Sequence, residues 1–165
     1  MTRCATPVTL TPSISMELTG TVGMILQHKG SHVWTLSPDT MVYEAIETMT
    51  DQNIGALLVV DNDRRLLGIV SERDYTRKIA LKGRSSKATA VRDIMTQNLV
   101  TVTPSHPIDE CMRLMTRTRI RYLPVLDEGI LVGMVSMGDL VKWIMGAQEM
   151  AIDQLEKYIV GEYPA

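Results

Sequence analysis

Apolar runs occur in the same order in both halves of the chain. Ile54–Val60 is a nearly continuous apolar run, as expected of a strand buried on both faces, and Leu66–Val70 follows it after a polar turn. The second half carries matching apolar runs at Ile120–Leu126 and Ile130–Val135. Each pair of runs is therefore predicted to form two consecutive strands.

Apolar stripes with helical spacing lie before each of these strand pairs. The residues that form them are Val42, Ile46 and Met49 in the first half, and Ile108, Met112 and Met115 in the second. Shorter entry strands are predicted at Ser31–Leu36 and Leu99–Val102, each closed by a proline turn, and a further helix follows each strand pair. The pattern predicts an α/β (α+β) fold built from two pseudo-symmetric β-α-β-β-α repeats and a C-terminal helix.

Composition and periodicity together divide the chain into five segments. They are a flexible Thr-, Ser- and Pro-rich tail over residues 1–20, a first repeat over 21–82, a basic linker over 83–90, a second repeat over 91–146 and an amphipathic C-terminal helix over 147–165. A short helix is expected at Thr21–Lys29, and Val91–Met95 leads into the second repeat in the same way. In the last segment Met150 or Ala151, Leu155 and Ile159 have helical spacing, so this helix should cover an apolar surface on its own chain or on a second subunit.

One short motif is present in both repeats. Gly68-Ile69-Val70-Ser71-Glu72-Arg73-Asp74 returns as Gly133-Met134-Val135-Ser136-Met137-Gly138-Asp139. A strand that passes directly into a helix leaves unpaired backbone N–H groups, which favour an anion, and the Asp carboxylate can accept hydrogen bonds from a diol. Ser-x-x-Asp is also an ordinary capping box, in which the two side chains satisfy each other's backbone N–H groups, and this alternative stays open.

Composition narrows the kinds of ligand that the chain is expected to bind and the compartment in which it is expected to work. The chain has 165 residues, 45% of them hydrophobic, and a formal net charge of -2, so its overall charge does not favour a long polyanion. Basic residues are nevertheless clustered between Arg73 and Arg92 and between Arg113 and Arg121, which suits a small phosphorylated ligand. Cys4 and Cys111 form no metal or disulfide pattern, and no apolar run is long enough to span a bilayer. These features predict a cytoplasmic protein that binds no metal and no membrane.

The repeated motifs resemble those of the cystathionine β-synthase (CBS) domain family. The segments that carry the resemblance are Ile-Gly-Ala-Leu-Leu-Val-Val-Asp, Gly-Ile-Val-Ser-Glu-Arg-Asp and Arg-Tyr-Leu-Pro-Val-Leu-Asp, within about residues 22 to 145. The chain is most similar to small stand-alone bacterial proteins that consist of one CBS pair, or Bateman module. This resemblance implies two repeats packed sheet to sheet, two clefts that bind adenine nucleotides such as AMP, ADP, ATP, NAD or S-adenosylmethionine, and a homodimer.

The resemblance also implies which residues line each cleft. One cleft would contain Ser71, Arg73, Asp74, Met95, Thr96, Val100, Ile120, Arg121 and Tyr122, with Arg119 or the basic linker nearby. The other would contain Gly30, Ser31, Trp34, Ile54, Gly55, Ala56, Ser136 and Asp139. Because Arg73 corresponds to Gly138 and Arg121 to Gly55, the Asp74 cleft is predicted to be the stronger phosphate site. The Asp139 cleft is better suited to a base or nucleoside.

The leading functional hypothesis is a regulatory module that senses an adenine nucleotide and signals to a separate effector protein. Enzymatic activity is not expected, because His28, His32 and His106 have no partners at a recognisable catalytic spacing. Two alternatives stay open: a homodimeric interaction module with vestigial nucleotide sites, and a weak binder of single-stranded nucleic acid. The second alternative is weakened by an aromatic content of only 4%, which leaves few rings for stacking on bases.

Overall fold

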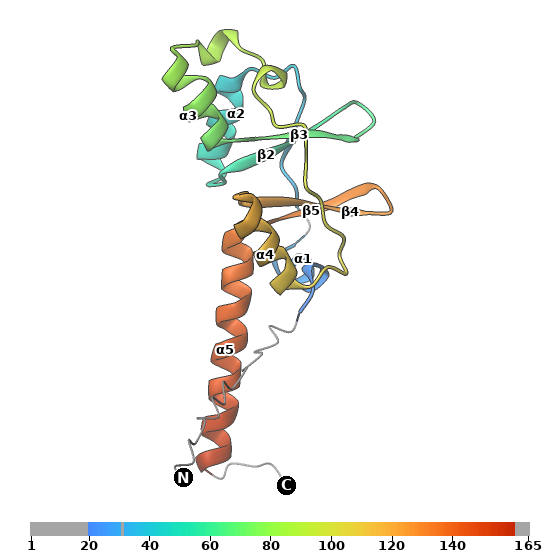
Figure 1. Cartoon of the computed structure of the whole chain (residues 1–165), viewed down its shortest axis with the longest axis vertical. Helices are drawn as coiled ribbons and strands as arrows, with labels where there is room; N and C mark the ends of the chain where they lie inside the picture. The colour runs from blue at the N-terminus through green and yellow to red at the C-terminus, as the bar shows by residue number, and fades with distance from the viewer. Residues whose placement is uncertain (1–19, 31, 161–165) are drawn as a thin grey trace, which may run out of the picture.

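The computed structural model describes residues 20–30 and 32–160, and for residues 154–160 it describes the helical backbone. The predicted tail, apart from Gly20, and the site candidate Ser31 therefore lie outside the described residues. The described chain forms two stacked units with a long helix projecting from the second (Figure 1). In each unit a small sheet faces the other unit and the helices lie on the outer side.

The order of elements follows the predicted repeat. The first half contains α1 (Val22–Lys29), β1 (Thr35–Leu36), α2 (Val42–Asp51), β2 (Ala56–Val60), β3 (Leu66–Ser71) and α3 (Glu72–Lys78). Three short 3-10 turns connect the halves: η1 (Ala80–Lys82), η2 (Ser86–Ala88) and η3 (Val91–Asp93). The second half contains α4 (Ile108–Thr118), β4 (Tyr122–Asp127), β5 (Ile130–Ser136) and α5 (Met137–Val160). The predicted fold class is confirmed.

The two sheets differ in their entry strands. In the first sheet β1 runs parallel to β2, and β2 pairs antiparallel with β3. In the second, β4 and β5 form an antiparallel pair, and the predicted strand Leu99–Val102 contributes only a single bridge from Val102 to Val125. That strand does not form because the connecting chain over 96–102 is shared between the two sheets: Thr96, three residues before Leu99, exchanges two backbone hydrogen bonds with Ile69 of β3.

Each repeat is completed by the leading segment of the other repeat. The core of the second repeat contains Val22, Ile25 and Leu26 from α1, packed among residues of α4, β4, β5 and α5. The core of the first repeat contains Val91 and Ile94 from the second leading segment. Backbone hydrogen bonds fix the same exchange, because Gly23 N–H donates to the Pro104 carbonyl while Val91 N–H donates to the Thr40 carbonyl. Val91–Met95, which opens the second repeat in sequence, therefore packs in the first repeat.

The glycines that open the repeated motif make room for these exchanged segments. A Cβ atom on Gly68 would lie 2.9 Å from both the Met95 sulfur and the Thr96 carbonyl oxygen. A Cβ atom on Gly133 would lie 2.7 Å from both terminal methyl carbons of Leu26. Both distances are shorter than a carbon atom tolerates, so the two glycines are required by packing rather than by backbone conformation.

The C-terminal helix is one continuous element. A break was predicted at Gly146, but α5 runs unbroken from Met137 to Val160 over 24 residues. An internal glycine costs a helix only about 1 kcal/mol relative to alanine, which the strong helix formers on both sides can offset. At 1.5 Å per residue the helix is roughly 36 Å long. Its distal half extends well beyond the repeats (Figure 1).

Candidate functional site

The repeated Ser and Asp form a reciprocal capping box in each repeat. At the start of α3, the Asp74 Oδ2 atom accepts hydrogen bonds from Ser71 N–H at 3.0 Å and from Ser71 Oγ–H at 2.7 Å. The Asp74 N–H in turn points at Ser71 Oγ at 3.4 Å. At the start of α5, Ser136 and Asp139 make the corresponding three contacts at 2.7, 2.9 and 3.1 Å. The capping alternative is therefore correct, and a ligand must share these carboxylates with the helix.

Asp74 retains capacity for a further donor. Its second oxygen, Oδ1, forms an ion pair with Lys78 Nζ at 2.8 Å, one turn along the same helix. A carboxylate oxygen has two lone pairs, so Oδ1 can accept another hydrogen bond while it is paired with Lys78. The side chain of Asp74 is 14% exposed, and that exposure is toward a cleft.

This cleft lies between the two repeats and has a volume of about 530 Å³. Its wall includes the start of α3 from the first repeat, the connecting segment at Thr96–Val100, and the end of α4 and start of β4 from the second repeat. A volume of this size is typical of pockets for small ligands and cofactors, roughly 300–1,000 Å³. We call it the Asp74 cleft.

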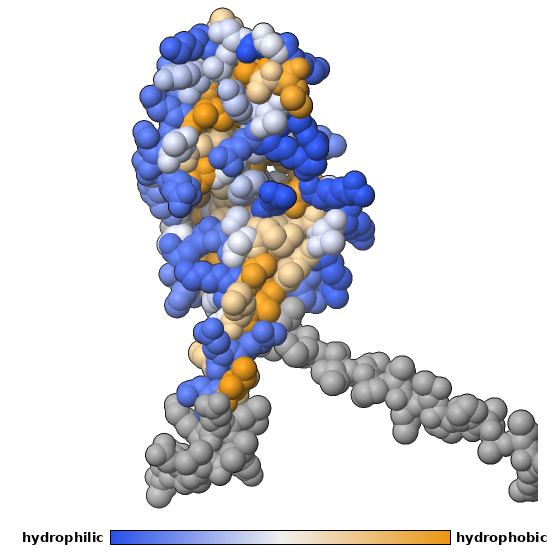
Figure 2. All heavy atoms as spheres, turned by 90° about the vertical axis from the view of Figure 1, so that its left-hand side faces the viewer, coloured by the Kyte–Doolittle hydropathy of each residue, from blue (hydrophilic) through white to orange (hydrophobic). Residues whose placement is uncertain are grey.

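Positive charge dominates the Asp74 cleft. Five basic residues line it, namely Arg73, Arg77, Lys78, Arg119 and Arg121, against the acidic Glu72 and Asp74. Figure 2 shows hydrophilic atoms gathered around a hollow at the level where the two units meet. Guanidinium groups bind phosphate through paired, charge-assisted hydrogen bonds, so this wall suits an anionic group.

Arg73 also joins the two repeats directly. Its Nη1 atom donates to the carbonyl of Arg119 at 3.2 Å. Arg119 ends α4 with a left-handed backbone at φ 57°, so Arg73 contacts the negative end of that helix dipole. A ligand that engages Arg73 therefore changes a contact across the repeat interface.

The structure brings most of the candidates for the first cleft together. The predicted residues that line the Asp74 cleft are Ser71, Arg73, Asp74, Thr96, Val100, Arg119, Ile120, Arg121 and Tyr122. Met95 lies elsewhere, since it packs against the core of the first repeat and over Gly68. Burial raises the pKa of Tyr122, Glu72 raises it further and Arg121 opposes the shift, so the phenol keeps its proton as a potential donor.

Gly55, which was predicted in the Asp139 cleft, instead lines the Asp74 cleft. Its position follows from sheet pairing, because Ala56 pairs with Ser71 in the antiparallel β2–β3 ladder. A Cβ atom on Gly55 would lie 2.2 Å from the Tyr122 hydroxyl, so the glycine allows Tyr122 to reach across from the second repeat. Ala56 is fully buried and Ile54 packs against the first core, so neither lies beside Asp139.

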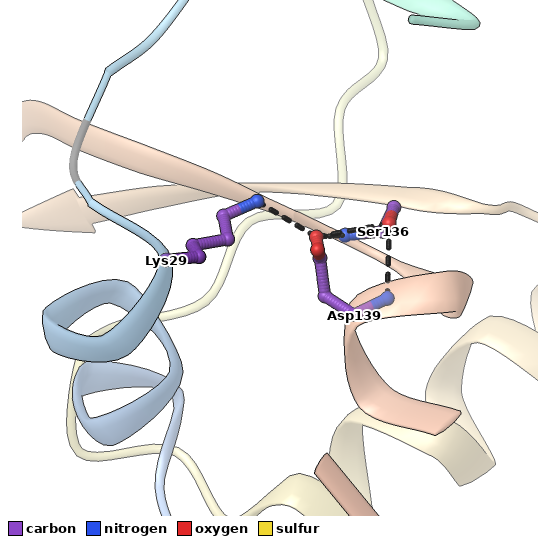
Figure 3. A network of polar contacts seen from close by, with 3 residues as sticks. All are labelled: Lys29, Ser136 and Asp139. Carbon is purple, nitrogen blue, oxygen red and sulfur yellow. Dashed lines mark hydrogen bonds and ion pairs between the residues drawn. The ribbon is translucent and has the colours of Figure 1, made fainter. Parts of the chain in front are cut away.

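Asp139 is held by a second, longer-range network (Figure 3). Lys29, the last residue of α1, forms an ion pair with Asp139 Oδ2 at 2.7 Å, on the oxygen that already accepts from Ser136. Burial raises the pKa of Asp139, but the hydrogen bonds from Lys29 and Ser136 and the positive charge of Lys29 outweigh burial and leave this pKa below its ordinary 3.8. The carboxylate is therefore ionised and already paired with a cation.

Two other candidates lie in the segment after α1. Gly30 has φ 87°, and no atom lies within 4 Å of the position where its Cβ would be. Trp34 is partly exposed and its ring packs edge-on against His32, with 4.6 Å between centroids. Gly30 and Trp34 thus follow Lys29 along the crossover from α1 to β1, while Ser31 between them is outside the described residues.

Several residues of the Asp74 cleft were not predicted. They are Ile69, Glu72, Arg77, Lys78, Asn98, Leu99, Thr118 and Pro124. Arg77 and Lys78 follow Arg73 and Asp74 by one helical turn, so helix periodicity could have identified them. Nothing in the spacing of Asn98 or Thr118 indicates the cleft, because their position depends on how the repeats pack.

Three further observations concern metal binding, membrane crossing and the cysteine of the second core. Among residues 20–30 and 32–160, no group of three or more His, Cys, Asp or Glu side chains is arranged to hold a metal ion. Within the same part of the chain, no helix combines the length and apolar character that crossing a membrane requires. Cys111 is a free, buried thiol of the second core.

Two pseudo-symmetric repeats that enclose a basic cleft define a tandem-repeat module. The model of the CBS domain matches the chain twice, over residues 29–81 and 91–146. The chain belongs to the CBS domain family.

Known proteins resemble the chain over most of its length. The mitochondrial CBS domain-containing protein CBSX3 of Arabidopsis thaliana is 46% identical over 138 residues, and the match covers 81% of this chain and 66% of that relative. A solved CBS-domain protein from Burkholderia ambifaria is 51% identical with a TM-score of 0.75, covering 78% of this chain and 96% of that one. The CBS domain pair of protein MJ0100, solved in complex with 5'-methylthioadenosine and S-adenosyl-L-methionine, is 26% identical with a TM-score of 0.69, and the coverage is 78% and 98%.

Proposed function

We propose that this chain is a regulatory module that binds an adenine nucleotide in the Asp74 cleft and passes its occupancy to a separate effector protein. One observation carries the proposal: a cleft of about 530 Å³, walled by both repeats, places the Asp74 carboxylate among five basic side chains. Apolar residues of the same wall, including Ile69, Val100 and Ile120, provide a surface for a base. Related pairs in the family bind adenosine compounds, as the MJ0100 complex illustrates.

Each part of a nucleotide has a complementary group in this cleft. The ribose diol would donate to Asp74 Oδ1, which has a lone pair beyond the one that Lys78 uses, and the Tyr122 hydroxyl is a further donor. The phosphates would be held by Arg73, Arg121 and their basic neighbours. The density of guanidinium groups favours AMP, ATP or NAD over an adenosine compound without phosphate.

The position of the cleft supports regulation rather than catalysis. The ligand would touch both repeats, and it would compete with the Arg119 carbonyl for Arg73, so it would favour one arrangement of the repeats over another. The described residues of the cleft include basic groups, hydroxyls and a capping carboxylate, but no nucleophile paired with a general base. The downstream effect therefore requires a second protein.

The Asp139 cleft would be the weaker of the two sites. Asp139 Oδ2 already accepts from Ser136 N–H, Ser136 Oγ–H and Lys29, so a diol that binds both oxygens of Asp139 must displace one of these donors. The glycine at position 138 also leaves this helix start without the arginine that the first repeat has at position 73. A base or nucleoside fits this side better than a phosphate.

The proposal is tested by nucleotide titration of the full chain in a calorimeter and by thermal shift. AMP, ADP, ATP, NAD and S-adenosylmethionine are compared at concentrations up to millimolar. A ligand at 100 times its dissociation constant stabilises the folded state by about 2.7 kcal/mol, which corresponds to a rise in Tm of roughly 5–10 °C for a chain of this size. Arg121→Ala should weaken binding of the phosphorylated ligands at least tenfold.

Matched variants separate a site effect from a general charge effect. Arg117→Ala removes an exposed arginine from α4 that does not line the Asp74 cleft, and it should leave binding unchanged. Asp74→Asn should weaken binding while circular dichroism shows that the fold is kept, because Ser71 still caps the helix and the asparagine amide oxygen can accept from Ser71 N–H. Unchanged affinity in both Arg121→Ala and Asp74→Asn would refute the site. No thermal shift with any nucleotide would support the vestigial alternative, and salt-dependent retention on an RNA column would support the nucleic-acid alternative.

A further inference from the structure

The distal part of α5 carries an exposed apolar stripe. Val141 is 41% exposed, Met145 56% and Ile152 56%, and these residues follow one another at intervals of four and seven positions. Exposed Gln148 occupies the place between Met145 and Ile152. Such alternating intervals of four and three residues are the a/d spacing of a coiled coil. We call these four residues the α5 stripe.

The α5 stripe is distinct from the face that α5 packs on its own repeat. Leu140 is fully buried, and Trp143 and Ile144 pack against the second core, so this inner face is already covered. Exposed Met150 continues the line of Trp143 and Ala147 rather than the α5 stripe. Figure 2 shows an apolar strip following α5 from the repeats toward its distal end.

The helix needs a partner for thermodynamic reasons. Helical segments shorter than about 12–15 residues are marginal in water, and most helical stability in proteins comes from packing an apolar face. The distal half of α5 extends past the repeats (Figure 1), and in the sequence Leu155 and Ile159 continue the four-and-three spacing. Covering this stripe is therefore expected to stabilise the helix that carries it.

Charge complementarity identifies the partner as a second copy of α5. Exposed Lys142 and Glu149 flank the same side of the stripe, one heptad apart. If two α5 helices pair antiparallel with Val141 opposite Ile152 of the second copy, then Met145 lies opposite Gln148. The same register sets Lys142 of each copy beside Glu149 of the other, twice in the dimer. Residues at these flanking positions set orientation and partner choice in coiled coils.

We propose that the α5 stripe is a homodimer interface, in which two α5 helices pair antiparallel with Val141 opposite Ile152 and Lys142 beside Glu149. The interface is self-complementary, as a two-fold dimer requires. It lies on the projecting helix and does not depend on nucleotide binding. Gln148 at a core position helps to select this register, because a polar core residue disfavours other alignments.

The test measures the dissociation constant of the full-length dimer by sedimentation equilibrium without nucleotide. Ile152→Glu should raise it at least about 100-fold, since it places a carboxylate against Val141 of the second copy. Glu149→Lys should raise it about tenfold by setting two like charges beside each other at two places. The double variant Lys142→Glu/Glu149→Lys restores opposite charges and should return the dissociation constant to within about threefold of wild type.

Controls keep the result interpretable. Glu128→Lys makes the same charge change in the exposed turn between β4 and β5 and should leave the dissociation constant unchanged. A wild-type chain that is still monomeric at about 100 µM would overturn the proposal. A dimer that survives Ile152→Glu, or a double charge swap that fails to recover association, would overturn it as well.

Discussion

The exchange of leading segments predicts a specific effect of Ile94→Ala. Ile94 follows the linker and lies at the start of the second repeat in sequence, yet its side chain is only 1% exposed within the core of the first repeat. The substitution removes three buried carbon atoms, which corresponds to about 2.4 kcal/mol of transfer free energy, and the residual cavity adds to this loss. We expect the free energy of unfolding to fall by about 3 kcal/mol and Tm to fall by roughly 6–12 °C.

Two measurements locate this loss of stability. Urea unfolding gives the free energy, and native-state hydrogen exchange shows which strands lose protection. Protection should fall most in β2 and β3, whose residues Leu57, Val59 and Val70 share the core with Ile94. Leu81→Ala is the matched control, because Leu81 lies nearby in the chain but is 78% exposed, and it should change stability by less than about 0.5 kcal/mol.

Either of two outcomes would refute the exchange of leading segments between the repeats. A loss below about 1 kcal/mol for Ile94→Ala would mean that the side chain is not buried in a tight core. A loss of protection confined to β4 and β5 would mean that the segment stabilises its own repeat.

Three further predictions follow from individual contacts. Gly55→Ala should lower the free energy of unfolding in urea by about 1–3 kcal/mol, because the added Cβ would lie 2.2 Å from the Tyr122 hydroxyl. Adding Tyr122→Phe should recover most of this loss, because the ring carbon that carries the hydroxyl is 3.4 Å from the same Cβ. Additive losses from the two substitutions would contradict this contact. The lowered pKa of Asp139 means that its ionised form stabilises the fold above about pH 3.8, and this stability is lost as the pH falls through the lower folded value. In an acid titration, Asp139→Asn should therefore lose less stability below pH 3.8 than wild type does. The same loss in both proteins would contradict the Lys29 ion pair. Burial raises the pKa of Cys111 to about 11, with Glu110 and Asp109 adding to the shift. In a Cys4→Ser background the Cys111 thiol should therefore resist a thiol reagent at pH 8 until urea unfolds the chain. Rapid labelling of the folded state would disprove its burial.

Local pattern was sufficient to predict the elements of the fold but not their partners. The apolar runs at β2 to β5 and the stripes of α2 and α4 have periods that depend only on local geometry, so they were predictable. The stripe Val22, Ile25 and Leu26 predicts an apolar face equally well, but nothing in its spacing says that the face packs on β5 of the other repeat. Helix continuity through Gly146 was missed because the penalty of one glycine is smaller than the sum of its neighbours' propensities.

The candidate site was predictable to the extent that its residues belong to the repeated motif. Ser71, Arg73 and Asp74 are adjacent in sequence, and the structure sets them at one helix start beside the cleft. Gly55 was assigned to the opposite cleft because the comparison of repeats shows which positions correspond, not which wall each position faces. The wall is decided by strand pairing, which sets Ala56 beside Ser71 and Tyr122 beside Ser136.

The exchanged segments also explain how a ligand in the Asp74 cleft can influence the whole chain. Thr96 lines the cleft and is hydrogen-bonded to Ile69 in the first sheet, while Val102, six residues later, is bonded into the second sheet. The same connecting segment begins at Ile94, in the first core. A ligand that shifts Thr96 must therefore move a connecting segment that is anchored in both repeats, because neither end can move without disturbing a buried core. The chain from α1, which is packed in the second core, to β1 of the first sheet makes the reciprocal connection, and Lys29 at its start is paired with Asp139 of α5.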